Sequence, residues 1–334
     1  MNLEIDYFED VMKRAHTGRA VGLLLILALL LPAAGQTQQP FEVALSGYSV
    51  GGCFFLAFPL PSSILWVNPD RVGFSDSDVI AIASAAGQPV FALLTGSTPK
   101  VATIQPDGSR APFFNAPPGF GGSAIAVAPT GRVFLNVAAG LAVISPAGVH
   151  EATYPMPGRN SDSVIAAAPD GCTVYYAKLL SVGRINGCTG AVLADFSSLT
   201  TSVSDIHPLS NGQVLIASGS NVVLHDASGA AIRTIASLPD YDLPGHTADQ
   251  IATTPDEQIL WIAAMAGCDN GGYLLRVSMS DGRELSRVNT GNISIGTGLV
   301  VGNATAEAIP TASAFSLCVL AALLALGGAM LLRK

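Results

Sequence analysis

The sequence predicts an all-β protein, a β-propeller of six four-stranded blades, and a repeated turn is the first observation behind this prediction. The turn recurs at spacings of 44, 40, 41 and 45 residues, counted from the third residue of each copy. A period in this range indicates one supersecondary unit copied several times, and four short strands per unit are typical of a propeller blade. The copies are Ala85-Ala86-Gly87, Pro129-Thr130-Gly131, Pro169-Asp170-Gly171, Ser210-Asn211-Gly212 and Pro255-Asp256-Glu257.

Two further observations agree with this fold. A short apolar run precedes each turn, and in most copies a second apolar run follows it. Charged residues make up only 12% of the chain and apolar residues 49%, with 35 glycines, which fits short strands and tight turns rather than helices or disorder. Lysine and arginine form no run outside the extreme ends. The sequence therefore predicts no nucleic-acid surface.

Residues 1–35 are predicted to be a secretory signal. Basic residues precede an unbroken apolar run from Ala20 to Leu31, and the small residues 33–35 supply a cleavage site before Gln36. The basic residues are Lys13, Arg14 and Arg19. An uncleaved anchor is the alternative, although about 20 apolar residues are needed to span a bilayer. The acidic stretch before Met12 is unusual for a signal, and Met12 is an alternative start.

Residues 36–41 form a polar linker, and residues 42–303 form the predicted propeller. Dividing this body by the period gives six blades, with 295–301 closing the ring against N-terminal strands; five or seven blades remain alternatives because the end units are irregular. The expected strands are 42–50, 53–58 and 64–67 in the first unit, 79–84 and 124–128 at the start of the next two, 163–168, 173–177, 182–186 and 191–196 in the clearest unit, then 203–209, 213–218, 221–226, 230–237, 250–254, 259–264, 272–278 and 284–289.

Several phrases in the second half of the body carry a family resemblance. They are Pro169–Tyr176, Cys188–Gly190, Gly212–Ala217 and Asp226–Gly229. The segment from Cys172 to Gly302 resembles bacterial propellers of the NHL/YVTN-like kind. The resemblance implies a secreted or surface-exposed propeller and names no activity.

The C-terminal end is predicted to contain a sorting motif and a transmembrane helix. Residues 315–332 carry no charge and are numerous enough to form a single transmembrane helix. The basic end 333–334 would lie in the cytoplasm. The linker 304–314 precedes it. The tail resembles the IPTL-CTERM sorting tails of Gram-negative bacteria, and the matching residues are Ile309, Pro310, Thr311 and Ser313. The resemblance implies cleavage by a sorting protease; a plain membrane anchor is the alternative.

Four cysteines lie in the predicted exported body, where disulfides persist. Cys172 precedes the second strand of its blade and Cys188 follows the third, so the two residues face each other across a hairpin. The sequence therefore predicts a Cys172–Cys188 disulfide, and a metal or redox pair is the alternative. Cys53 and Cys268 remain as a second pair, supported by the remaining count and by ring closure.

Acidic and imidazole side chains stand at or just before the predicted inner strands, which approach the mouth of the central channel. The candidate ligand-binding residues are Asp78, Asp162, Asp205, His207, His246 and Asp249. Meeting from different blades, they could hold Ca²⁺ or another divalent ion, or supply an acid and a base. The alternative interpretation is that these acids cap turns and accept backbone N–H groups.

Taken together, these patterns predict an exported propeller that is tethered to the membrane or sorted to the surface and acts as a binding module. Its partner would be an envelope protein, a polysaccharide or a small ligand. A lactonase-like hydrolase that uses the channel-mouth acids with a divalent metal is one alternative. A structural component of the envelope is another. No catalytic motif of a known enzyme class occurs in the sequence.

Overall fold

The computed structural model describes part of the chain. Its described backbone covers residues 43–49, 62–68, 71–76, 79–94, 100–104, 110–117, 120–159, 164–266, 272–291 and 293–301. These residues belong to the larger of two compact units, residues 40–334. The predicted signal, sorting motif and transmembrane segment lie outside the described residues, as do Cys53 and Cys268. No helix among the described residues is long and apolar enough to cross a membrane.

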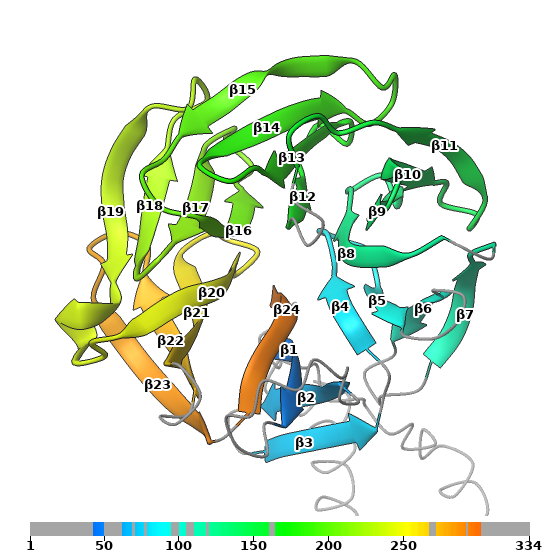
Figure 1. The fold of residues 1–334 in the computed structure, drawn as a ribbon. Coiled ribbons are helices and arrows are strands. Elements are labelled where there is room, and N and C mark those ends of the chain that lie inside the picture. The colour runs from blue at the N-terminus through cyan, green and yellow to red at the C-terminus, as the bar shows by residue number, and fades with distance from the viewer. Residues whose placement is uncertain are drawn as a thin grey trace, which may run out of the picture. The chain divides into compact units, whose positions relative to one another are not determined.

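Six four-stranded antiparallel sheets follow one another around a common centre (Figure 1), so the predicted propeller is confirmed. Blade 1 contains β24 (Ile293–Val301), β1 (Val43–Ser49), β2 (Ser62–Asn68) and β3 (Arg71–Asp76); blade 2 contains β4 (Val79–Ala83), β5 (Val90–Leu94), β6 (Lys100–Ile104) and β7 (Arg110–Asn115); blade 3 contains β8 (Gly122–Val127), β9 (Val133–Val137), β10 (Gly140–Ile144) and β11 (His150–Tyr154). Blade 4 contains β12 (Ile165–Ala167), β13 (Thr173–Ala177), β14 (Ser181–Asn186) and β15 (Val192–Ser198); blade 5 contains β16 (Val203–Pro208), β17 (Val214–Ser218), β18 (Asn221–His225) and β19 (Ala231–Ser237); blade 6 contains β20 (His246–Thr253), β21 (Ile259–Ala266), β22 (Gly272–Ser278) and β23 (Glu284–Gly291).

The C-terminal strand closes the ring, as the sequence predicts. β24 takes the inner position of blade 1 and pairs antiparallel with β1, with Val301 opposite Val43. Its backbone also lies close to blade 2, because a Cβ added at Gly298 would come within 2.3 Å of the carbonyl oxygen of Ile82. β3 was not among the expected strands; its sequence, RVGFSD, carries only two apolar side chains, at Val72 and Phe74, and includes a glycine. The expected strand 53–58 lies outside the described residues.

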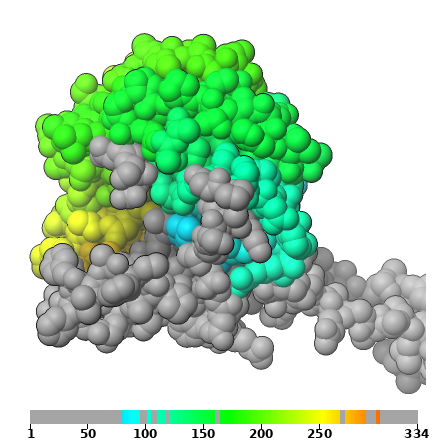
Figure 2. Space-filling view, turned by 45° about the vertical axis from the view of Figure 1, so that its right-hand side comes forward, coloured from blue at the N-terminus to red at the C-terminus, as the bar shows by residue number. Residues whose placement is uncertain are grey.

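Apolar side chains fill the spaces between neighbouring blades. One cluster joins blades 5 and 6 and includes the fully buried Leu215 and Ile262. Another joins blades 3 and 4 and includes Phe134 and Tyr176. Figure 2 shows the described atoms of blades 3 and 4, coloured cyan-green to green, adjoining each other. Each blade therefore stabilises its neighbours, as expected for repeated units that cannot bury both faces alone.

A glycine in the turn between the third and fourth strands packs against the outer strand of the preceding blade. At Gly229 the backbone has φ +92°, and an added Cβ would lie 1.6 Å from the carbonyl oxygen of Phe196. The turns of blades 3 and 6 show the same approach, to the carbonyl oxygens of Phe113 and Ile235; the glycines are Gly148 and Gly282. This contact joins the rim of one blade to the rim of the next and leaves no room for a side chain.

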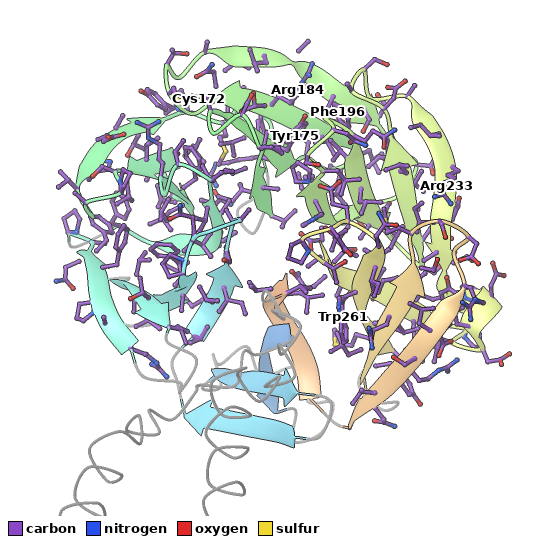
Figure 3. All side chains as sticks on the ribbon, turned by 180° about the vertical axis from the view of Figure 1, so that it is seen from behind. Cys172, Tyr175, Arg184, Phe196, Arg233 and Trp261 are labelled. Carbon is purple, nitrogen blue, oxygen red and sulfur yellow. A yellow bond between two sulfur atoms is a disulfide. The ribbon has the colours of Figure 1, made fainter. Side chains whose placement is uncertain are left out.

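The predicted Cys172–Cys188 disulfide is present in blade 4 (Figure 3 labels Cys172), with the two Cα atoms 5.3 Å apart. The N–H of Gly187 donates to the carbonyl oxygen of Cys172, which holds the two ends of the β13–β14 hairpin together. Arg132 of blade 3 donates from Nη1 to Sγ of Cys188 at 3.1 Å and forms an ion pair with Glu151. The bridge therefore fixes one hairpin and also lies at the boundary between two blades.

Removal of this disulfide is expected to destabilise the protein by about 3 kcal/mol, because the bridge closes a loop of 16 residues in the unfolded chain. The variant is Cys172→Ala with Cys188→Ala, and urea denaturation measures its free energy of unfolding. The wild-type protein under reducing conditions is the control, and it should lose the same amount. A double variant as stable as the oxidised protein would contradict a stabilising role.

Candidate functional site

The inner strands carry bulges near their first residues, and these bulges shape the candidate site. The register between β20 and β21 shifts between Ala248 and Gln250, and the register between β16 and β17 shifts between Val203 and Asp205. Inner strands β4 and β8 have a shift at a similar place. A bulge breaks the alternation of a strand and redirects its side chains. Asp249 is the unpaired residue of the bulge in β20, and its side chain is half-buried.

Asp205 links the inner strands of blades 5 and 6. Its side chain is buried, with 7% of the residue exposed. One carboxylate oxygen accepts the N–H of Ile206 at 2.8 Å, and the other accepts the N–H of Ile251 in β20 at 2.7 Å. An inner strand has no neighbour in its own sheet on the side of the axis, so its N–H groups on that side need other acceptors. Asp205 supplies an acceptor to two strands at once.

Burial raises the pKa of the Asp205 carboxyl to about 7, because the charged form is poorly solvated there. The two N–H donors lower this pKa, and the nearby carboxylate of Asp249 raises it. Burial also raises the pKa of Asp249, and the hydroxyl of Thr247, which donates to its Oδ1 at 2.7 Å, lowers it. Asp249 of blade 6 therefore lies close enough to Asp205 of blade 5 to raise the pKa of its carboxyl group.

His207 makes a second link across the same junction. Its Nε2 lies 2.9 Å from the hydroxyl oxygen of Thr253 in β20. Burial lowers the pKa of His207 to about 4, and the carboxylate of Glu257 acts in the opposite direction. The imidazole is therefore neutral over most of the physiological range. It lies further along β16 than Asp205, toward the turn that contains Glu257.

His246 begins β20 and is buried, with 8% exposed. Its ring centroid lies 5.6 Å from that of Tyr273, and neither ring nitrogen has a hydrogen-bond partner among the described residues. It occupies the same junction between blades 5 and 6, because Ala248, two positions later in β20, belongs to the apolar cluster of that junction.

The four described candidates come from two different blades, from β16 of blade 5 and β20 of blade 6, and they lie at the junction between these blades. Asp78 and Asp162 lie outside the described residues. Asp205 accepts backbone N–H groups, as the alternative interpretation expects of such acids. A ligand-binding role for the four remains a prediction.

Within the described part of the chain, no group of three or more His, Cys, Asp or Glu side chains is placed to hold a metal ion. Calcium binding at the channel mouth therefore remains a prediction with no described ligand set. The acids at exposed turns have local partners instead. Asp170 accepts two backbone N–H groups, and Asp226 accepts the N–H of Ser228 and of Ala230.

Sequence analysis did not identify the partners of Asp205 and His207. These partners are the N–H of Ile251 and the hydroxyl of Thr253, each 46 residues further along the chain. The separation is close to the repeat period, which is the one signal that could have paired them. A second signal is the residue type at this position. Asp205 directly follows the bulge of its inner strand, and two other blades have alanine at the same place, at Ala81 and Ala124, so an acid there is unusual.

Comparison with known proteins supports the fold. No family model matches the chain, and no curated protein matches it. A crystal structure of a protein of unknown function from Bacteroides caccae is similar at 16% identity and a TM-score of 0.55, over 77% of this chain and 97% of that one. A crystal structure of a nidogen/laminin complex is similar at 9% identity and a TM-score of 0.53, over the same shares. Virginiamycin B lyase from Staphylococcus aureus has a TM-score of 0.46 at 16% identity, over 65% of this chain and 71% of its own. By its fold the chain is a β-propeller, and at these identities the likeness extends no further than the fold.

Proposed function

We propose that this protein is an exported β-propeller of the NHL/YVTN-like kind that acts as a binding module at the bacterial cell envelope. In this proposal an IPTL-CTERM tail tethers it to the membrane or sorts it to the surface. The observation that carries the proposal is the disulfide within a blade of the body, Cys172–Cys188. Structural disulfides form and persist in oxidising compartments, so this bridge supports passage out of the cytoplasm.

The position of the closing strand supports a tethered arrangement. β24 ends at Val301, opposite Val43 at the start of β1, so both ends of the described propeller leave from the same end of blade 1. β24 is the inner strand of blade 1, so the end of the propeller where it finishes is the end at which the inner strands finish. Asp249 lies in the first half of β20, toward the other end. A tether attached after β24 would leave the Asp249 end accessible to partners, and loops at such positions commonly bind ligands.

Cell fractionation tests export and tethering. The full-length protein should sediment with envelope membranes, and a variant that lacks residues 304–334 should be exported in soluble form. A variant that lacks residues 1–35 should stay in the cytoplasm with thiols at Cys172 and Cys188 that react with an alkylating reagent. If instead the full-length protein is found in the cytoplasm with both thiols reactive, the proposal is wrong. Mass spectrometry of the mature C-terminus then distinguishes an anchor from cleavage near Pro310.

A binding assay tests the accessible end of the propeller. The exported protein is mixed with purified envelope polysaccharide, and co-sedimentation measures the bound fraction. Asp249→Asn should reduce binding several-fold if a ligand contacts the half-buried carboxylate at this end. Asp240→Asn is the matched control, because Asp240 is an exposed acid in the connection between blades 5 and 6. Equal loss in both variants would indicate a general effect of charge rather than a site.

A further inference from the structure

We propose that the Cys172–Cys188 disulfide is a thiol-exchange site with a fixed direction, in which an external thiolate bonds to Sγ of Cys172 and Cys188 leaves as a thiolate held by Arg132. The reactant is a small thiol, and the product is a mixed disulfide at Cys172. The inference concerns the chemistry of the bridge and does not depend on the proposed export or binding role.

Arg132 places a cation at one sulfur of the bridge. Its Nη1 donates to Sγ of Cys188 at 3.1 Å, and its Nε donates to Oε2 of Glu151, also at 3.1 Å. Glu151 therefore holds one side of the guanidinium group while another N–H faces the sulfur. The carboxylate of Glu151 offsets part of the positive charge, but its side chain is 38% exposed, so water weakens this effect. A guanidinium group beside a sulfur stabilises the thiolate that forms there.

The repeat shows that this arginine departs from the pattern of the other blades. Arg132 directly follows the repeated turn of blade 3. In blade 2 the residue at the same place also reaches the next blade, where Nε2 of Gln88 donates to the carbonyl oxygen of Pro129 at 2.8 Å. The corresponding residues of blades 5 and 6 are also glutamine, Gln213 and Gln258. Blade 3 therefore has a cation where three other blades have a neutral amide, and the blade that follows it contains the bridge.

The two cysteines have opposite electrostatic surroundings. The backbone N–H of Cys172 donates to Oδ1 of Asp170 at 2.9 Å, so a thiolate at Cys172 would form close to a carboxylate. The backbone N–H of Cys188 donates to a neutral group, Oδ1 of Asn186, also at 2.9 Å. Negative charge is therefore favoured on Cys188, beside the guanidinium group, and disfavoured on Cys172.

These surroundings set the direction of exchange. The attacking thiolate forms a new S–S bond to Cys172 while the bond between Cys172 and Cys188 breaks, and the electron pair of that bond stays on the sulfur of Cys188. The sulfur that leaves is the better stabilised thiolate, which speeds its departure. Cys188 stays close to the mixed disulfide and expels the thiol again by the reverse step.

A small thiol can reach the bridge, because both cysteines are half-buried and the exposed residues Asp170 and Thr189 flank them. The carboxylate of Asp170 also repels an incoming thiolate, but it is exposed, so solvent and salt screen this repulsion. The leaving charge forms in direct contact with the guanidinium group of Arg132, where screening is weaker. The stability of the leaving thiolate therefore decides which sulfur is attacked.

Residue-level mapping of the full chain tests this direction. The protein is incubated with reduced glutathione, quenched with acid and digested with pepsin without reduction, and mass spectrometry locates the glutathione. It should lie on Cys172 several-fold more often than on Cys188. Arg132→Gln, which introduces the residue type of three other blades, should abolish this preference, and Arg132→Lys, which keeps the charge, should retain part of it. Arg283→Gln is the matched control and should keep the preference, because it removes an exposed arginine from a turn of blade 6.

Alkylation of the single variants gives an independent measurement. In Cys172→Ser the free Cys188 should react with iodoacetamide several-fold faster at about pH 7 than the free Cys172 of Cys188→Ser, because the thiolate is the reacting form. In urea, where the contact with Arg132 is lost, the two rates should converge. Three results would overturn the proposal: glutathione found equally on both cysteines or mainly on Cys188, a preference that Arg132→Gln leaves unchanged, or equal alkylation rates in the two folded variants.

Discussion

Replacing Gly229 by alanine is expected to destabilise the propeller by about 3 kcal/mol or more, whereas replacing Gly212 by alanine should cost about 1 kcal/mol. Both glycines have positive φ, +92° and +83°, so both variants bear the cost of a left-handed backbone. They differ in their surroundings. A Cβ at Gly229 would lie 1.6 Å from the carbonyl oxygen of Phe196, whereas the nearest atom to a Cβ at Gly212 is Cβ of Ala227 at 3.9 Å.

The difference between the two variants isolates the contact between the rims of blades 4 and 5. Relief of the clash requires the turn of blade 5 to move away from β15, which would loosen both blades. Urea denaturation measures the two free energies of unfolding. Gly148→Ala repeats the test on another blade pair, because its Cβ would lie 2.2 Å from the carbonyl oxygen of Phe113. Equal losses in Gly229→Ala and Gly212→Ala would mean that the blade contact adds nothing beyond the backbone strain.

Removal of the closing strand should have the largest effect of all. A variant that lacks residues 293–334 loses β24, which pairs with β1 and lies beside β4 and β20. The buried Leu299 and Val300, 8% and 5% exposed, each contribute roughly 2 kcal/mol of apolar burial. The same deletion leaves β1 without its inner partner. We expect this variant to lose cooperative unfolding and to become sensitive to protease.

The matched control for this deletion lacks only residues 304–334 and keeps β24 intact. It should unfold at the same urea concentration as the full chain, because the propeller buries its core between blades. Circular dichroism and limited proteolysis compare the two truncations. If both truncated proteins unfold alike, β24 does not close the ring in the way the pairing with β1 indicates.

The regular features of the fold could be predicted from the sequence, because they repeat. The turn containing Asp170 and the strands around it recur with one period. The blade order and the closing strand could therefore be predicted by dividing the body of the chain by this period. The Cys172–Cys188 pair also followed, because both residues flank a single hairpin. β3 was missed because it carries only two apolar side chains, and a strand of that kind is recognised only once its pairing with β2 is seen.

The site was harder to predict because its contacts run between repeats. Asp205 looks like any acid near an inner strand, and its role depends on the N–H of Ile251 in the next blade. The sequence pattern places both residues at the same level of the ring but does not show which side of the strand each occupies. The bulge before Asp205 changes the side of the strand on which its side chain lies, and no residue in the sequence marks the position of this bulge. The sequence therefore identified the acid of this junction but not its partner in the next blade.

The pairing of β1 with β24 also sets the order in which the protein can be completed during synthesis. Val43 meets Val301, 258 positions later in the chain. Blades 2 to 6 consist of consecutive strands and can form as they appear, but blade 1 must wait for nearly the last residue of the body. Contacts so distant in sequence form slowly, and an unpaired strand edge invites aggregation while it waits. A cell that makes this protein therefore needs to shield the first strand until the last has arrived, and an export route that delivers the chain unfolded would postpone that problem to the far side of the membrane.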